Sequence, residues 1–375
     1  MTVVARPNAL DQTYDAAPLE LFFDLVYVFA VAQLAHHLLN HLAWRGGAET
    51  LVMLLAVFAV WNYTSWAVSM FPAHRAGTRL MILIVMLLGL FMNASVTRAF
   101  TTSGWVFVGP FLMIQLGRTF WTFVNSTGAI FREQYVRTLL WLTAIAPLWV
   151  AGAVADPDAR LVWWTLAAGL DLAGTWLAHP IPGRQLYSEH VWFEGGHMVE
   201  RCRLFLMIAL GETILATGRS IAAAPLEPMT VVTGTATPIG VAALWALGFG
   251  SADRLILQNV GETSDPVPAS RHAGNGLIVA VAGLIAVAVA NNLAITHPRG
   301  HAPAALEPLL FGGSILFLIA QGWYLWAVLH ITPRLRMFGC AALAVVGISA
   351  RLTPPFVALL LASTALAVLA GLERQ

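Results

Sequence analysis

Two acidic residues in the first apolar segment have the types and spacing that suit charge or proton chemistry inside a membrane. Glu20 and Asp24 lie four residues apart, so a helix places both on one face. Charged side chains among apolar residues are costly and normally face the interior of a helix bundle. We expect both carboxylates near the beginning of this helix, where either an arginine lies between them or one of them is protonated.

A polar stripe follows at the other end of the same segment. Its members are Gln33, His36, His37 and Asn40, which repeat at helical spacing. Such a stripe is suited to line an aqueous vestibule, and its histidines titrate near neutral pH. His37 and His41 have the spacing of a metal-binding pair, but no third ligand follows at a usual distance. The sequence therefore predicts no metal and no cofactor.

The seventh apolar segment carries another group of charges. Glu200 and Arg201 begin it, and Glu212 is the deepest acid of the chain. Arg201 and Glu212 share a face because they are close to three helical turns apart. Arg118 and Asp171 lie at membrane depth in other segments and are the partners expected for Glu212. The alternative is an internal ion pair that only fixes helix packing.

Smaller polar and thiol side chains complete the set of candidate residues. Asn93, Asn291 and Asn292 are expected to hydrogen-bond between helices, at about 0.6 kcal/mol each. Asn291 is also counted among the candidate pathway or buried polar residues. Cys202 and Cys340 have no metal-ligand spacing around them and are interpreted as small buried hydrophobes.

The elements that position these residues follow from composition. Of 375 residues, 58% are hydrophobic and 10% charged, whereas soluble domains average about 25% charged residues. A net charge of +1 gives no reason to expect nucleic acid. Apolar runs long enough to cross a bilayer recur along the chain. We predict an all-α, polytopic membrane helix bundle of about twelve spanning helices, at 19–42, 48–71, 79–98, 104–124, 138–155, 161–178, 200–219, 231–251, 275–296, 306–330, 335–350 and 354–371.

The orientation of these helices follows from the arginines. With the N-terminus inside, the cytoplasmic loops hold thirteen arginines and the opposite loops hold six. Positive charge gathers on the cytoplasmic side, so both termini should be cytoplasmic. The first eighteen residues show no signal peptide, and the first helix is expected to direct insertion.

The predicted organisation is a cytoplasmic segment (1–18), a six-helix half (19–178), a cytoplasmic linker (179–199), a second six-helix half (200–371) and a tail (372–375). The halves share faint similarity, since residues 109–118 resemble residues 312–321. Arg137 and Arg336 open corresponding helices, and Trp61 and Trp245 lie in another corresponding pair. These features predict two parallel six-helix repeats, related by an axis along the membrane normal. Chance similarity among apolar helices is the alternative.

Two blocks of sequence carry a family resemblance. Residues 18–30 (PLELFFDLVYVFA) and residues 197–201 (HMVER), continuing through 208–214 (IALGETI), closely resemble the bacterial low temperature requirement protein A family. A looser block runs from residue 272 to residue 298. The chain departs from its relatives at 248–253, where their aromatic, Asp-containing ending appears only as GFGSAD. The resemblance implies a multispan protein of the bacterial inner membrane and supplies no molecular activity.

A weaker likeness concerns residues 22–24 (FFD). They are similar to the Phe-Ser-Asp signature of lysosomal potassium channels, which are built from two six-helix repeats. Phe23 replaces the serine of that signature.

Three functions are compatible with these residues. The first is a transporter or channel for a small cation or proton, with Asp24 and Glu212 on the pathway. The alternative is a membrane-embedded enzyme on a lipid-phase, isoprenoid-like substrate, although no nucleophile or phosphate motif accompanies the acids. The third is a membrane sensor or partner protein that uses the histidine stripe. The expected partners are membrane lipid and a small ion or lipid-phase molecule, and the chain is a monomer or homodimer.

Overall fold

The structure is a computed structural model that describes residues 18–71, 75–101, 104–126, 128–180, 195–225, 227–263, 267–299 and 303–373. These residues form helices and short connections without a strand, which confirms the predicted all-α class. Residues 1–17 of the predicted segment 1–18 and most of the linker 179–199 lie outside the described residues. By its contacts the chain divides into two compact units, an N-terminal unit (Pro18–Trp192) and a C-terminal unit (Phe193–Gln375).

The helices of the N-terminal unit match the predicted segments and often extend beyond them. α5 begins nine residues before its predicted start because its first turns are polar and project past the apolar run. The helices are α1 (Pro18–Asn40), α2 (Trp44–Met70), α3 (Ala76–Ala94), α4 (Trp105–Asn125), α5 (Ala129–Val154) and α6 (Pro157–Trp176), with a 3-10 turn η1 (Val96–Arg98) after α3.

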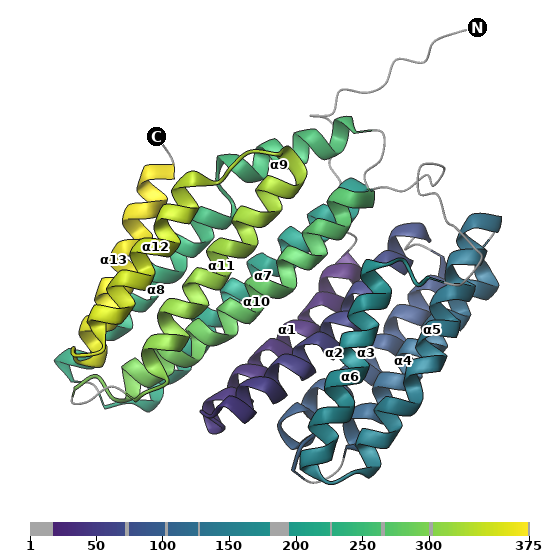
Figure 1. The fold of residues 1–375 in the computed structure, drawn as a ribbon, viewed down its shortest axis with the longest axis horizontal. Helices are drawn as coiled ribbons and strands as arrows, with labels where there is room; N and C mark the ends of the chain where they lie inside the picture. Colours follow the sequence, from purple (N-terminus) through teal and green to yellow (C-terminus); the bar gives the residue numbers. More distant parts are fainter. Residues whose placement is uncertain are drawn as a thin grey trace, which may run out of the picture. The chain divides into compact units, whose positions relative to one another are not determined.

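These helices close into a ring, seen as the purple-to-teal bundle in Figure 1. Around the ring, α1 packs on α2, α2 on α6, α6 on α5, α5 on α4, α4 on α3, and α3 returns to α1. α2 also contacts α4 across the ring. Asn93 on α3 donates its amide to the Val26 carbonyl of α1 at 2.8 Å, which confirms the interhelical role predicted for it.

The C-terminal unit contains a corresponding ring and one further helix. Its described helices are α7 (Gly195–Ala223), α8 (Pro228–Gly248), α9 (Ser251–Glu262), α10 (Val267–Thr296), α11 (Leu306–Leu329), α12 (Arg334–Ala350) and α13 (Pro355–Glu373). Neighbours follow the order α7, α8, α13, α12, α11, α10 and back to α7. This is the neighbour order of the N-terminal unit once α9 is set aside.

α9 is the helix that the sequence reading missed. It is short and amphipathic, so a search for long apolar runs passes over it. Ile256 and Val260 are buried, whereas Leu255 one position away is exposed. Its packing partners are α7 and α11.

Length and hydropathy support a multi-pass membrane protein. Within the described ranges, nine helices are long and apolar enough to cross a bilayer. α4, α6 and α12 fall below that criterion; α12 has 17 residues, the lower limit for a span. The count of twelve spans therefore stays a prediction. On α3, Leu80, Leu83, Leu87 and Phe91 are exposed at helical spacing, a face suited to contact with lipid.

Glycines let α10 and α11 approach closely. A Cβ atom on Gly313 would lie 2.7 Å from the Gly283 carbonyl oxygen and 2.9 Å from the Ala286 Cβ atom. The reverse holds for Gly283, whose Cβ would lie 2.5 Å from the Gly313 oxygen. Gly312, the neighbouring residue, faces open space. Small residues at such crossings are the usual basis of helix association in membranes.

The Gly313→Ala variant is expected to destabilise the fold by about 1–3 kcal/mol, because the added methyl group overpacks the crossing. Gly312→Ala is the matched control, since it adds the same group in open space and favours the helix by up to about 1 kcal/mol. Thermal unfolding in detergent measures both. Equal unfolding temperatures would contradict the close crossing.

Candidate functional site

The first pair of predicted acids lies inside the N-terminal unit. Glu20 is 3% exposed and Asp24 is 1% exposed. The indole Nε1–H of Trp61 on α2 donates to Asp24 Oδ1 at 2.7 Å. Trp61 is itself fully buried, so the carboxylate is held by a rigid donor that water does not reach.

Arg118 on α4 is buried among neutral oxygens. Its guanidinium donates to Gln115 Oε1 at 2.7 Å, to Thr119 Oγ1 at 3.1 Å and to Thr64 Oγ1 at 3.2 Å. The two threonine hydroxyls donate their own protons to backbone carbonyls, which leaves their lone pairs for the guanidinium. Among the described residues, every hydrogen-bond partner of Arg118 is neutral, including the Val60 carbonyl at 3.3 Å.

Tyr63 connects Arg118 to Asp171. The guanidinium carbon lies 5.2 Å from the centre of the Tyr63 ring, a cation–π arrangement. The phenol oxygen lies 2.9 Å from Asp171 Oδ1, Thr175 Oγ1 and His179 Nε2. Asp171 and His179 are each 3% exposed. We call Tyr63, Arg118, Asp171, Thr175 and His179 the Tyr63 cluster.

The chain folds back to place His179. α6 ends at Trp176, and Ala178 and His179 then both adopt φ of 54°. Left-handed backbone is uncommon for residues other than glycine and costs of order 1–3 kcal/mol at each position. The His179 N–H closes the turn by donating to the Gly174 carbonyl at 2.7 Å. The strained turn directs the imidazole into the interior of the unit.

The proton positions in this cluster follow from counting donors. The one proton of the Tyr63 hydroxyl goes to Asp171, so Nε2 of His179 must donate to Tyr63. The other ring nitrogen, Nδ1, then accepts from Gln134 Nε2 at 3.3 Å. Burial lowers the pKa of His179 to about 4, which keeps the ring neutral at pH 7. An imidazole, a phenol and a carboxylate thus form one directed hydrogen-bond chain.

An aromatic layer lies next to this cluster. It consists of Phe107, Phe111, Trp149 and Trp164, each at most 1% exposed. The ring centroids of Phe111 and Trp149 lie 4.6 Å apart, and those of Phe107 and Trp164 lie 5.6 Å apart. Phe111 precedes Arg118 by two helical turns, or about 10 Å. The layer closes the interior between the Tyr63 cluster and the opposite end of the unit.

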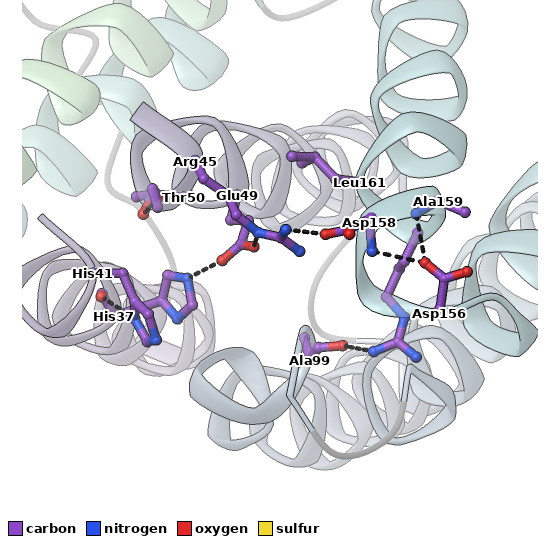
Figure 2. Close-up of polar contacts among 12 residues, drawn as sticks. His37, His41, Arg45, Glu49, Thr50, Ala99, Asp156, Asp158, Ala159 and Leu161 are labelled. Atoms are coloured by element: carbon purple, nitrogen blue, oxygen red, sulfur yellow. Dashed lines mark hydrogen bonds and ion pairs between the residues drawn. The ribbon is translucent and has the colours of Figure 1, made fainter. Parts of the chain in front are cut away.

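A second polar cluster lies beyond the aromatic layer and is drawn in Figure 2. Glu49 on α2 accepts from Arg45 Nε at 2.8 Å, and its other oxygen lies 3.0 Å from His37 Nε2 on α1. Arg45 also pairs with Asp158 at the start of α6. We call His37, Arg45, Glu49 and Asp158 the Glu49 cluster. It ties the ends of three helices together.

The start of α6 is further secured by Asp156 and Arg160. Asp156 caps the helix by accepting from the Ala159 and Asp158 N–H groups at 3.0 Å each, which holds the pKa of Asp156 below its usual range. Arg160 donates to the Ala99 carbonyl at 2.6 Å and also to the Gly152 carbonyl at 3.0 Å. These bonds fix the position of the helix that carries Asp171.

The predicted stripe on α1 divides between two environments. His37 is 1% exposed and faces Glu49. His36 and Asn40 are exposed, and Asn40 Nδ2 lies 3.1 Å from His36 Nε2. Gln33 is half-buried. His41 stacks on His37 with ring centroids 4.5 Å apart, but its Nδ1 donates to the His37 carbonyl. In the part of the chain that the structure describes, no three His, Cys, Asp or Glu side chains gather as a metal site.

The charges of α7 lie in the C-terminal unit. Glu212 pairs with Arg219, seven residues further along the same helix, and its side chain is 14% exposed. Arg201 is 1% exposed. Glu200 pairs with Arg203, which also makes two bonds to Asp253 at 2.9 and 3.0 Å. The expected pairing of Glu212 with Arg118 or Asp171 stays a prediction.

Sequence reasoning identified the charged members of the Tyr63 cluster and missed the neutral ones. Arg118 and Asp171 stand out because charges are rare in apolar segments. Tyr63 lies in the middle of a predicted span, where it was expected only to help pack helices together, and His179 falls in the predicted linker. The only available signal for His179 was a histidine placed directly after a segment that contains an acid.

The sequence model of the bacterial low temperature requirement A protein (LtrA) family matches residues 15–371. The chain belongs to this family. The chain is also similar to an uncharacterized protein of Rhizobium meliloti (strain 1021), 28% identical over 347 residues that cover 90% of this chain and 83% of the relative. No solved structure matches this LtrA-family chain.

The buried, neutral His179 predicts a pH dependence of stability. The unfolded side chain has a pKa near 6.5 and the folded one about 4, so the unfolded state binds the extra proton between these values. The free energy of unfolding should therefore fall as the pH falls from about 6.5 towards 4. His179 contributes at most about 3 kcal/mol to this fall. His179→Asn tolerates the left-handed backbone and should flatten this part of the profile. Thermal unfolding from pH 7 to pH 4.5 tests it; identical slopes for the two proteins would contradict it.

Proposed function

We propose that this membrane protein transports protons or a small cation, and that the Tyr63 cluster is part of the pathway. The observation that carries the proposal is the hydrogen-bond chain from His179 through Tyr63 to Asp171. Ionisable residues inside membrane helices commonly mark ion pathways and proton relays. A neutral imidazole can release one proton while it takes up another, so such a chain can move a proton along its length.

Asp24 extends the proposed pathway across α2. Trp61, which holds Asp24, and Tyr63, which holds Asp171, lie within one turn of the same helix. Asp24 and Asp171 thus place one negative charge on each side of this turn. The Arg118 guanidinium lies over the Tyr63 ring and compensates the charge of Asp171. The acids are buried, as a pathway that excludes bulk water requires.

The aromatic layer favours a transporter over a permanently open channel. The rings of Phe107, Phe111, Trp149 and Trp164 fill the interior between the two polar clusters. An ion that enters from the Tyr63 side meets this layer before it reaches Glu49. A change of conformation is therefore part of the proposed cycle.

The shared neighbour order of the two units supports the proposal of two six-helix repeats. Two rings with the same order are expected if one ancestral ring was duplicated. Arg137 and Arg336, which open corresponding helices, are 3% and 4% exposed, whereas Trp61 is buried and Trp245 is exposed. The units therefore share a framework and differ in their interiors. Inner-membrane insertion with both termini cytoplasmic remains part of the proposal.

Proton flux into proteoliposomes tests the function. Under an imposed pH gradient, with a pH-sensitive dye inside, vesicles with the protein should collapse the gradient faster than empty vesicles. Asp171→Asn and Asp24→Asn are expected to slow this flux by about tenfold or more, the equivalent of about 1.4 kcal/mol in a barrier. Potassium and sodium gradients, run in parallel, identify the ion that moves.

Two tyrosine variants provide the matched comparison. Tyr63→Phe removes the hydroxyl that links Asp171 to His179 and should slow flux. Tyr135→Phe removes a buried hydroxyl whose hydrogen bond, within the described residues, goes to Met70 Sδ at 3.1 Å, and should not slow flux. Glu212→Gln tests whether the C-terminal unit takes part. Vesicles as tight as empty ones would refute transport and favour the lipid-phase enzyme or the sensor. Flux that is unchanged in Asp171→Asn and Tyr63→Phe would refute the pathway.

A further inference from the structure

Positive charge gathers at one end of the N-terminal unit, where α3 begins, α4 ends and α5 begins. Arg75 directly precedes α3, Arg79 lies in the first turn of α3, and Arg132 lies in the first turn of α5. All three side chains are exposed. The sequence from residue 50 to residue 132 contains five arginines and no Asp or Glu. We call Arg75, Arg79 and Arg132 the arginine patch.

The end of α4 brings the members of this patch to one level. α4 lies between α3 and α5 in the ring. A Cβ atom on Gly77, which lies between the first two arginines, would be 3.5 Å from the Trp121 ring. On the other side of α4, the guanidinium carbon of Arg132 lies 5.1 Å from the centre of the Phe123 ring. Neighbouring helix axes are about 8–10 Å apart, so arginine side chains from α3 and α5 can approach one group that lies over the end of α4.

The charge of the patch is not balanced by a neighbouring carboxylate. Glu133 follows Arg132 in the sequence, but its Oε1 atom lies 3.1 Å from Arg137 Nε. Within the described residues, neither Arg75 nor Arg132 forms an ion pair with an Asp or Glu side chain. The patch therefore carries a net positive charge and attracts anions.

The outer face of α4 continues from the patch as an exposed apolar surface. Met113, Phe120 and Val124 have exposed fractions of 62%, 57% and 61%. Gly117 lies on the same face, because these four positions repeat at helical spacing. A Cβ atom on Gly117 would meet no atom within 4 Å, so the glycine leaves open space along this face. An acyl chain can lie along α4 while its headgroup lies beside the arginines.

We infer that the arginine patch binds the phosphate headgroup of an anionic glycerophospholipid whose acyl chain lies along the outer face of α4. Guanidinium groups match phosphate oxygens, because they donate parallel hydrogen bonds and keep their charge. Basic residues at the ends of membrane helices attract anionic lipids. Trp121 beside the patch is typical of the level at which headgroups meet the hydrocarbon core. The site goes beyond the proposed transport, because lipid binding does not require ion flux.

Native mass spectrometry of the delipidated, full-length protein in a non-ionic detergent tests the inference. The first phosphatidylglycerol molecule should bind at least about tenfold more tightly than phosphatidylcholine with the same acyl chains. Arg75→Gln and Arg132→Gln should each weaken phosphatidylglycerol binding about fivefold, whereas Arg132→Lys keeps the charge and should retain most of the affinity. Arg351→Gln is the matched control, since it removes an exposed arginine at the end of α12 in the C-terminal unit.

The possible results separate this inference from its alternatives and from the proposed function. Equal affinity for the two lipids would overturn it, and so would equal weakening in Arg132→Gln and Arg351→Gln. Competition by soluble glycerol 3-phosphate at the concentrations at which the lipid binds would show a site for free phosphate and overturn the lipid site. Asp171→Asn should bind phosphatidylglycerol as the wild type does, whatever its flux. Phosphatidylglycerol should also raise the unfolding temperature of the wild type more than that of Arg132→Gln.

Discussion

One turn of α2 holds the interior of the N-terminal unit together. Trp61 reaches Asp24 on α1, Thr64 receives Arg118 from α4, and Tyr63 binds Asp171 on α6. Apolar side chains alone do little to fix the alignment of neighbouring helices in a membrane, because lipid solvates them equally well. Buried charges do fix this alignment, since each must find its partners inside the bundle. The central position of α2, against α1, α4 and α6, follows from this requirement.

The interior of the N-terminal unit consists of two polar clusters with an aromatic layer between them. The Tyr63 cluster joins an imidazole, a phenol and a carboxylate by hydrogen bonds, and the Glu49 cluster binds three helix ends together through charge. The rings of Phe111 and Trp149 between them exclude water. The C-terminal unit has the same ring of helices, but its small cavity between α8, α10, α11 and α13 is lined largely by apolar side chains, such as Leu244 and Leu366. The same arrangement of helices thus surrounds two different interiors.

The sequence predicted what depends on apolar runs and isolated charges. The helices appear near the expected ranges, and the burial of Asp24, Arg118 and Asp171 follows from the cost of charge in hydrocarbon. α9 was missed because its apolar residues occupy only one face. His179 was missed because its place depends on two residues of left-handed backbone, which no residue type there signals. The exposure of His36 and the burial of His37 depend on how α1 is rotated about its own axis, and residue spacing alone does not give that rotation.

The proposed pathway requires that Asp171 exchanges a proton through Tyr63. Infrared difference spectra of the reconstituted protein between pH 7 and pH 5 measure carboxyl protonation directly. We expect a carboxyl band in the wild-type spectrum that is absent in Asp171→Asn, is displaced in Tyr63→Phe, and is unchanged in Tyr135→Phe. Spectra that are the same in wild type and Asp171→Asn would show that Asp171 takes up no proton, and would contradict the pathway.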